Sequence, residues 1–111
     1  MRIYMVNDLT PDQMTELRAL LDRKDMASAM DGLYWLDMPE NLLSDEQREH
    51  LPNCGPYSMG LELLDDCVQL ELLVRARNKI RCSCVAYADA RQRTFAMEAV
   101  DTLFHDLDIP V

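Results

Sequence analysis

The sequence predicts an α+β fold: a mixed sheet of about five strands, with two long helices on one face and a short third helix. Alternating apolar and polar residues between positions 57 and 88 are typical of strands. Three helix starts follow from an N-capping residue with Gln three positions later, at Thr10, Ser44 and Asp89. A chain of 111 residues fits a single domain spanning positions 1–111.

The N-terminal part of the chain reads as strand, helix and strand. Residues 2–6 are mostly apolar on both faces, which favours an interior strand. The helix predicted to begin at Thr10 runs to about Lys24, because Met14, Leu17, Leu20 and Leu21 recur at helical spacing. A second strand covers 33–38. This order predicts a parallel, right-handed crossover between the two strands.

The segment between the second strand and the sheet's C-terminal part is predicted to hold the short helix. Ser44 begins it, and Pro52 limits it to about His50. A turn at 53–56 then leads into an antiparallel meander of three strands, 57–64, 67–76 and 80–88. The final long helix begins after Asp89, and its apolar positions continue to Leu107.

Turn lengths set the expected register of the meander. A two-residue turn at 65–66 pairs Leu63 with Val68, Leu61 with Leu70, and Met59 with Leu72. A three-residue loop at 77–79 keeps the apolar faces together, and it pairs Val74 with Cys82 and Leu72 with Cys84. Both cysteines are therefore expected on the apolar face of one regular strand.

Charge and hydropathy exclude some partners. The net charge is −9, from 11 basic and 20 acidic residues, which argues against nucleic acid and against anionic membranes. No apolar run approaches the length of a membrane span. Asn7 and Asp8 interrupt the N-terminal apolar residues, so the sequence shows no signal peptide and predicts a cytoplasmic protein with reduced cysteines.

One group of residues has the chemistry of a metal site. Thiolates and imidazole are ordinary zinc ligands, and four such side chains make a closed tetrahedral site. The candidates are His50, Cys54, Cys82 and Cys84. Their spacing departs from the usual pairs of cysteines separated by two residues. Burial of the cysteines as small apolar residues is therefore the preferred interpretation. No cofactor is predicted, and zinc bound by these four residues is the alternative.

Catalysis has weaker support. Cys54 and His50 are a nucleophile and base by residue type, but no third member or oxyanion-binding device is visible. Pro52 is expected to keep the two off one helical face. No catalytic residue is assigned, and the interpretation leans away from an enzyme.

The leading hypothesis is a non-enzymatic interaction or ligand-binding module. The sheet side opposite the apolar core, called the back face, is expected to combine charged residues with apolar ones that anchor a protein partner or a second copy of the chain. The candidates are Trp35, Leu73, Val85 and Tyr87. Coverage of this face by segment 39–56 is the alternative interpretation, and a zinc-binding domain is the second functional hypothesis.

Overall fold

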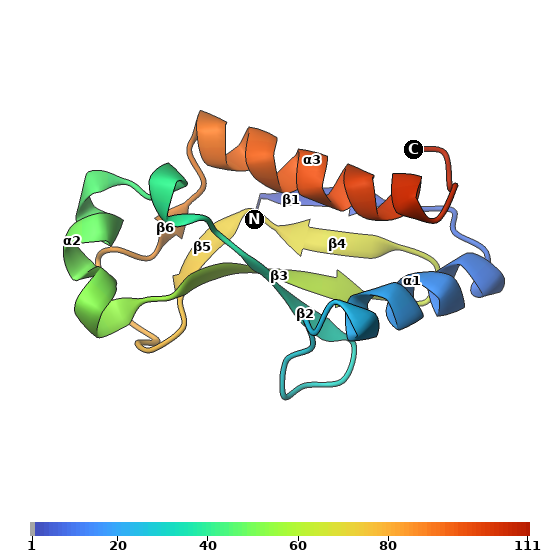
Figure 1. The fold of residues 1–111 in the computed structure, drawn as a ribbon, viewed down its shortest axis with the longest axis horizontal. Helices are drawn as coiled ribbons and strands as arrows, with labels where there is room; N and C mark the ends of the chain where they lie inside the picture. The colour runs from blue at the N-terminus through green and yellow to red at the C-terminus, as the bar shows by residue number, and fades with distance from the viewer. Residues whose placement is uncertain (1) are drawn as a thin grey trace.

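In a computed structural model that describes residues 2–111, three α-helices pack with a six-stranded antiparallel sheet, which confirms the α+β class (Figure 1). The helices are α1 (Pro11–Arg23), α2 (Asp45–Cys54) and α3 (Ala90–Asp106), with a short 3-10 helix η1 (Glu40–Leu42) before α2. The strands are β1 (Ile3–Val6), β2 (Leu33–Asp37), β3 (Tyr57–Leu63), β4 (Val68–Glu71), β5 (Leu73–Ala76) and β6 (Ala86–Tyr87).

All three predicted helix starts are confirmed. Thr10, Ser44 and Asp89 each accept a hydrogen bond from the backbone N–H three residues later. The side-chain oxygen of the glutamine at that third position accepts a hydrogen bond from the backbone N–H of the capping residue, which completes a capping box at each of the three helices. The glutamines of α2 and α3 are buried, whereas that of α1 is half-buried.

Strand β3 is the centre of the sheet. Leu61 pairs with Tyr34 of β2 and with Leu70 of β4, so β2 and β4 lie on opposite edges of β3. Ser58 likewise pairs with β2 and β5, which places β4 and β5 along the same edge. They are two halves of one broken strand. The outer edge of this broken strand pairs with β1 along β4 and with β6 along β5.

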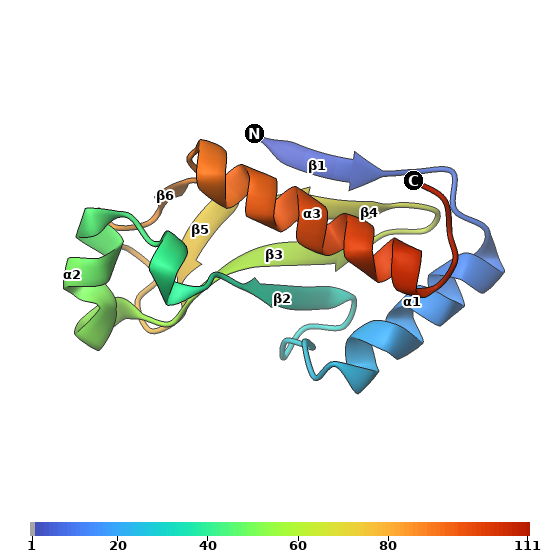
Figure 2. The same cartoon turned by 45° about the horizontal axis from the view of Figure 1, so that its top comes forward.

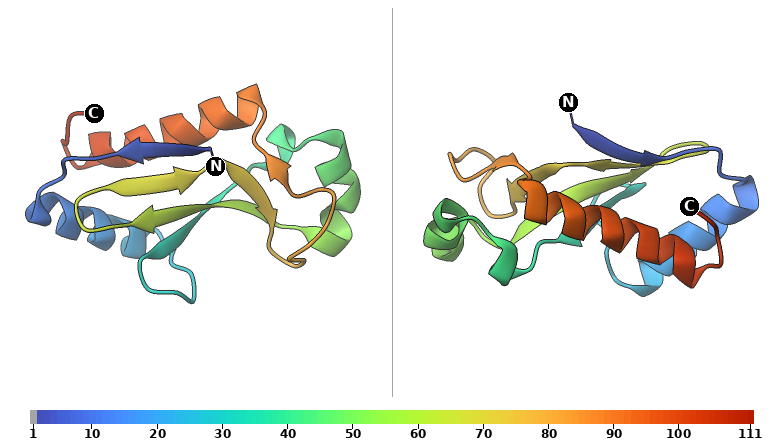
Figure 3. Two further views of the ribbon diagram at one scale, coloured as in Figure 1. Left: turned by 180° about the vertical axis from the view of Figure 1, so that it is seen from behind. Right: turned by 90° about the horizontal axis from the view of Figure 1, so that it is seen from above.

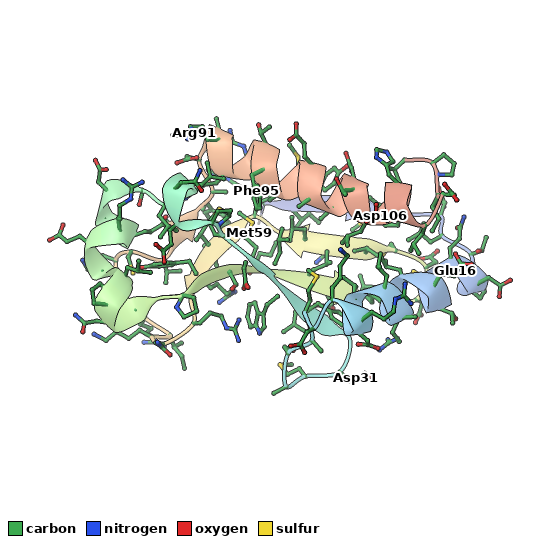
Figure 4. The ribbon with its side chains drawn as sticks, in the orientation of Figure 1. Glu16, Asp31, Met59, Arg91, Phe95 and Asp106 are labelled. Atoms are coloured by element: carbon green, nitrogen blue, oxygen red, sulfur yellow. The ribbon has the colours of Figure 1, made fainter. Side chains whose placement is uncertain are left out.

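The two long helices and the sheet enclose the core. Helix α3 crosses the sheet obliquely, and α1 lies beside its C-terminal end (Figure 2). Seen from behind, the strands lie in front of both long helices (Figure 3). Met59 lies inside this layer, whereas Glu16 and Asp31 extend outward (Figure 4). The side chains buried most completely are contributed by α1, α3 and the central strands, and include Leu17, Leu21, Met59, Leu61, Leu70, Val100 and Phe104.

The predicted mixed sheet with a parallel crossover is wrong. Each strand pair among residues 2–111 is antiparallel, and β1 pairs with β4 instead of with β2. The chain reverses after α1, because Trp35 N–H donates to Met26 C=O (2.8 Å) and Ser28 N–H donates to Leu33 C=O (3.0 Å). This local hairpin turns β2 around before it reaches β3. The expected interior position of residues 2–6 is also wrong, since β1 is an edge strand.

The meander is correct in its first half only. Leu63 faces Val68 and Leu61 faces Leu70, as predicted. The strand then breaks at Leu72. The Leu72 N–H donates to Arg2 C=O, and the Leu72 C=O accepts from Ala88 N–H. Beyond the break Tyr57 pairs with Ala76, so Met59 does not face Leu72. The expected third strand is reduced to β6, with Val74 opposite Ala86 instead of Cys82.

Helix α2 lies beyond one end of the sheet (Figure 1). Segment 39–56 therefore does not cover the back face, in contrast to the alternative interpretation of the sequence. Within residues 2–111, no helix combines the length and the hydropathy that crossing a bilayer requires.

Candidate metal centre

Two of the candidate ligands lie one turn apart on α2. The helix continues through Pro52 to Cys54, so His50 and Cys54 are in the i, i+4 relation that places side chains on one helical face. The expectation that Pro52 would separate them is wrong. Gly55 follows directly and ends the helix, and its N–H donates to Leu51 C=O at 3.0 Å. The C-terminal end of α2 therefore presents an imidazole and a thiol together.

The other two candidates lie in the loop between β5 and β6, not on a strand. Residues 82–85 form a turn closed by a 3.1 Å hydrogen bond from Val85 N–H to Cys82 C=O. The turn directs both sulfurs toward one point. Alternation along a strand was expected to place the two cysteines on the same face. The predicted residues are thus brought together by a different local structure.

The four side chains converge on one point. One ligand atom from each of His50, Cys54, Cys82 and Cys84 lies within 4.8 Å of all the others. His50 Nδ1 lies 3.1 Å from Cys82 Sγ. A tetrahedral zinc ion with bonds of about 2.0 Å to nitrogen and 2.3 Å to sulfur requires ligand atoms roughly 3.5–3.8 Å apart. The cluster is therefore of the right size for a single ion.

Burial and charge distinguish the three cysteines. Cys54 and Cys84 are each 1% exposed, whereas Cys82 and His50 are half-buried at the outer side of the cluster. The Cys84 backbone N–H, aided by the neighbouring thiols and His50, lowers the pKa of Cys82 to about 6. Burial and hydrogen bonds to the other two sulfurs raise the pKa of Cys54 to about 11. Of these two thiols, Cys82 therefore loses its proton more readily than Cys54.

A buried amide network fixes the ligand turn. The Gln47 side chain donates to Cys84 C=O at 3.2 Å, and its oxygen accepts from the Gln92 side chain at 3.0 Å. Gln92 also donates to Leu42 C=O at 2.9 Å. The Tyr57 hydroxyl donates to Gln47 C=O at 2.9 Å. Helices α2 and α3 and strand β3 are thereby tied to the turn that carries two ligands, an arrangement that orients metal ligands in known sites.

The loop is also tied directly to the end of α2. Asn78 N–H donates to Cys54 C=O at 3.1 Å, and its side chain donates to Gly55 C=O. Arg77 N–H donates to Pro56 C=O at 2.8 Å. These backbone contacts hold the two ligand-bearing segments side by side.

The sequence alone did not single out Gln47 and Gln92. At the third position of a helix a glutamine is explained by capping, and nothing in its spacing indicates a partner 37 or 45 residues away. Their burial is the signal that separates them from Gln13, and burial is visible only in the structure.

The residues predicted for partner binding do not form one patch. Leu73 and Tyr87 are cross-strand neighbours on β5 and β6, and Arg2 stacks on the Tyr87 ring at 4.7 Å. Val85 packs against the core. Trp35 lies across the sheet on β2, where it pairs with Gly60. The structure thus separates Trp35 from the other three.

Comparisons with protein families, with curated proteins and with solved structures found no match to this chain.

Proposed function

We propose that this chain is a zinc-binding domain with a closed site formed by His50, Cys54, Cys82 and Cys84. The observation that carries the proposal is the convergence of their four ligand atoms within 4.8 Å. Thiolate-rich sets with an imidazole suit zinc, whereas magnesium and calcium prefer oxygen ligands. An iron–sulfur cluster contains more than one iron and needs a wider cage. The free cysteines fit a reducing compartment such as the cytoplasm.

The role of the ion in this proposal is structural. Four protein ligands complete a tetrahedron and leave no position for water or substrate, which is the difference between structural and catalytic zinc sites. The ion would join α2 to the β5–β6 loop, since each contributes two ligands. The loop contains little regular structure between residues 77 and 85. Zinc would order this loop, which the hydrogen bonds of the sheet do not hold in place. In this proposal the domain acts by binding and not by catalysis.

Native mass spectrometry of freshly purified, untagged protein under reducing conditions tests this proposal. We expect one zinc ion per chain, removed by a chelator, because the site is closed and the ligands are preassembled. Elemental analysis of the same sample identifies the ion. A chain that stays at its apo mass after incubation with one equivalent of zinc would refute the proposal. A mass of twice the chain would show self-association in the same spectrum.

A further inference from the structure

The only tryptophan of the chain lies on the back face among three surface hollows. Trp35 is half-buried, and it lies beside Gly60, where an added Cβ would be 3.9 Å from the indole ring. The hollows have volumes of about 390, 190 and 190 Å³. An indole that lines several hollows can contact a side chain of a binding partner.

One of the smaller hollows combines apolar and cationic walls. Its lining is Trp35, Arg75, Ala76, Arg77 and Ile80. The Arg77 guanidinium stacks on the Trp35 ring at 4.5 Å, which leaves the planar group positioned beside the hollow. Ile80 is 92% exposed at the rim. Arg75 is already neutralised by Glu71 at 2.8 Å, so Arg77 is the cation available to a ligand.

The loop that borders this hollow is positively charged in a strongly acidic chain. Arg77, Lys79 and Arg81 are exposed, and no carboxylate of residues 2–111 forms an ion pair with any of them. The chain as a whole has a net charge of −9. Unpaired cations gathered at one place on such a surface attract a negatively charged partner there and repel it elsewhere. The other small hollow shares Trp35 and Arg77 with this one, but it also contains Asp25 and Asp37, whose carboxylates repel a negatively charged partner. The site is therefore restricted to the hollow beside Ile80.

We propose that Trp35, Arg77 and Ile80, with Lys79 and Arg81, form a docking site for an acidic peptide segment that carries an apolar side chain. The hollow of about 190 Å³ accepts one apolar side chain between Trp35 and Ile80. Neighbouring carboxylates pair with Arg77, whose guanidinium forms two parallel hydrogen bonds to such a group. A nucleic acid fits less well, because its phosphates and bases need a longer basic track with several aromatic side chains.

This inference rests on the proposed function at one point. Ile80 and Arg81 directly precede the ligand Cys82, so zinc would hold the loop that forms one wall of the docking site. We therefore expect chelation to weaken peptide binding by about tenfold, since the loop must then be ordered on binding. Zinc content is measured in each sample, so a failure of zinc binding is distinguished from a failure of peptide binding.

The test uses the full chain and a displayed library of random dodecapeptides. Retained peptides are synthesised, and their binding is followed by the emission of Trp35, the single tryptophan. We expect acidic peptides with an aromatic or aliphatic residue. Arg77→Glu should weaken their binding by tenfold or more. Arg91→Glu makes the same charge change at an exposed position of α3 and should leave binding within about twofold.

The outcomes are decisive in both directions. A library that yields neutral or basic peptides, or none above the background of Arg77→Glu, overturns the proposed site. Tighter binding of a 20-nucleotide single-stranded DNA than of the best peptide overturns the peptide as its ligand. Equal losses in Arg77→Glu and Arg91→Glu would show a nonspecific charge effect and would also refute it. Peptide binding by a chain that takes up no zinc would leave the site standing and refute the zinc proposal alone.

Discussion

Replacement of Cys54 by Ser is expected to weaken zinc binding by about a hundredfold or more, because four ligands share the binding free energy of a structural zinc ion. The thiol is 1% exposed and sits at the C-terminal end of α2, so no other side chain can take its place. The melting temperature should fall by on the order of 10 °C, since the bound ion stabilises only the folded state. Competition with a chromophoric chelator measures the affinity, and calorimetry measures the melting temperature.

Cys67→Ser is the matched control. Cys67 is also free and buried, at 8% exposure, but it lies directly before β4 and outside the ligand cluster. It should retain one zinc ion with unchanged affinity. Equal zinc affinities in the two variants would mean that Cys54 is only a small core residue.

Replacement of Gln47 by Leu is expected to lower the free energy of unfolding by about 2–4 kcal/mol, because the buried amide group of Gln92 and the C=O of Cys84 lose partners. Zinc affinity should fall by about tenfold, the usual effect of removing a group that orients a ligand. Urea denaturation of the zinc-loaded protein measures the first quantity.

Gln13→Leu provides the comparison for this variant. Gln13 forms the same capping box in α1, and its side chain has no tertiary hydrogen bond among the described residues. Its loss should cost about 1 kcal/mol or less and leave zinc binding unchanged. If the two substitutions destabilise the protein equally, then the amide network contributes only helix capping.

Local signals predicted much of the fold. The three capping boxes located every α-helix start, and the turn at 65–66 set the β3–β4 register, because both depend on residues within a few positions of each other. The arrangement of strands did not follow. The N-terminal strand is mostly apolar on both faces and reads as interior, yet Ile3 and Met5 are 37% and 41% exposed at the edge.

The candidate site was predicted by residue type and missed in its geometry. Alternation in 80–88 resembles a strand, but the segment leaves the sheet so that Cys82 and Cys84 reach the end of α2. Pro52 looked like the end of the helix, although α2 extends past it to Cys54. The Gln47–Gln92 network and the hydrogen bonds of Arg77 and Asn78 link these segments, and such long-range contacts leave no local pattern in the sequence.

X-ray absorption at the zinc edge of the loaded protein tests the central claim most directly, because it reports the atoms bound to the ion. The account predicts three sulfur atoms at about 2.3 Å and one nitrogen at about 2.0 Å. A first shell of oxygen and nitrogen atoms alone would contradict it, since such an ion would be bound elsewhere on this acidic surface.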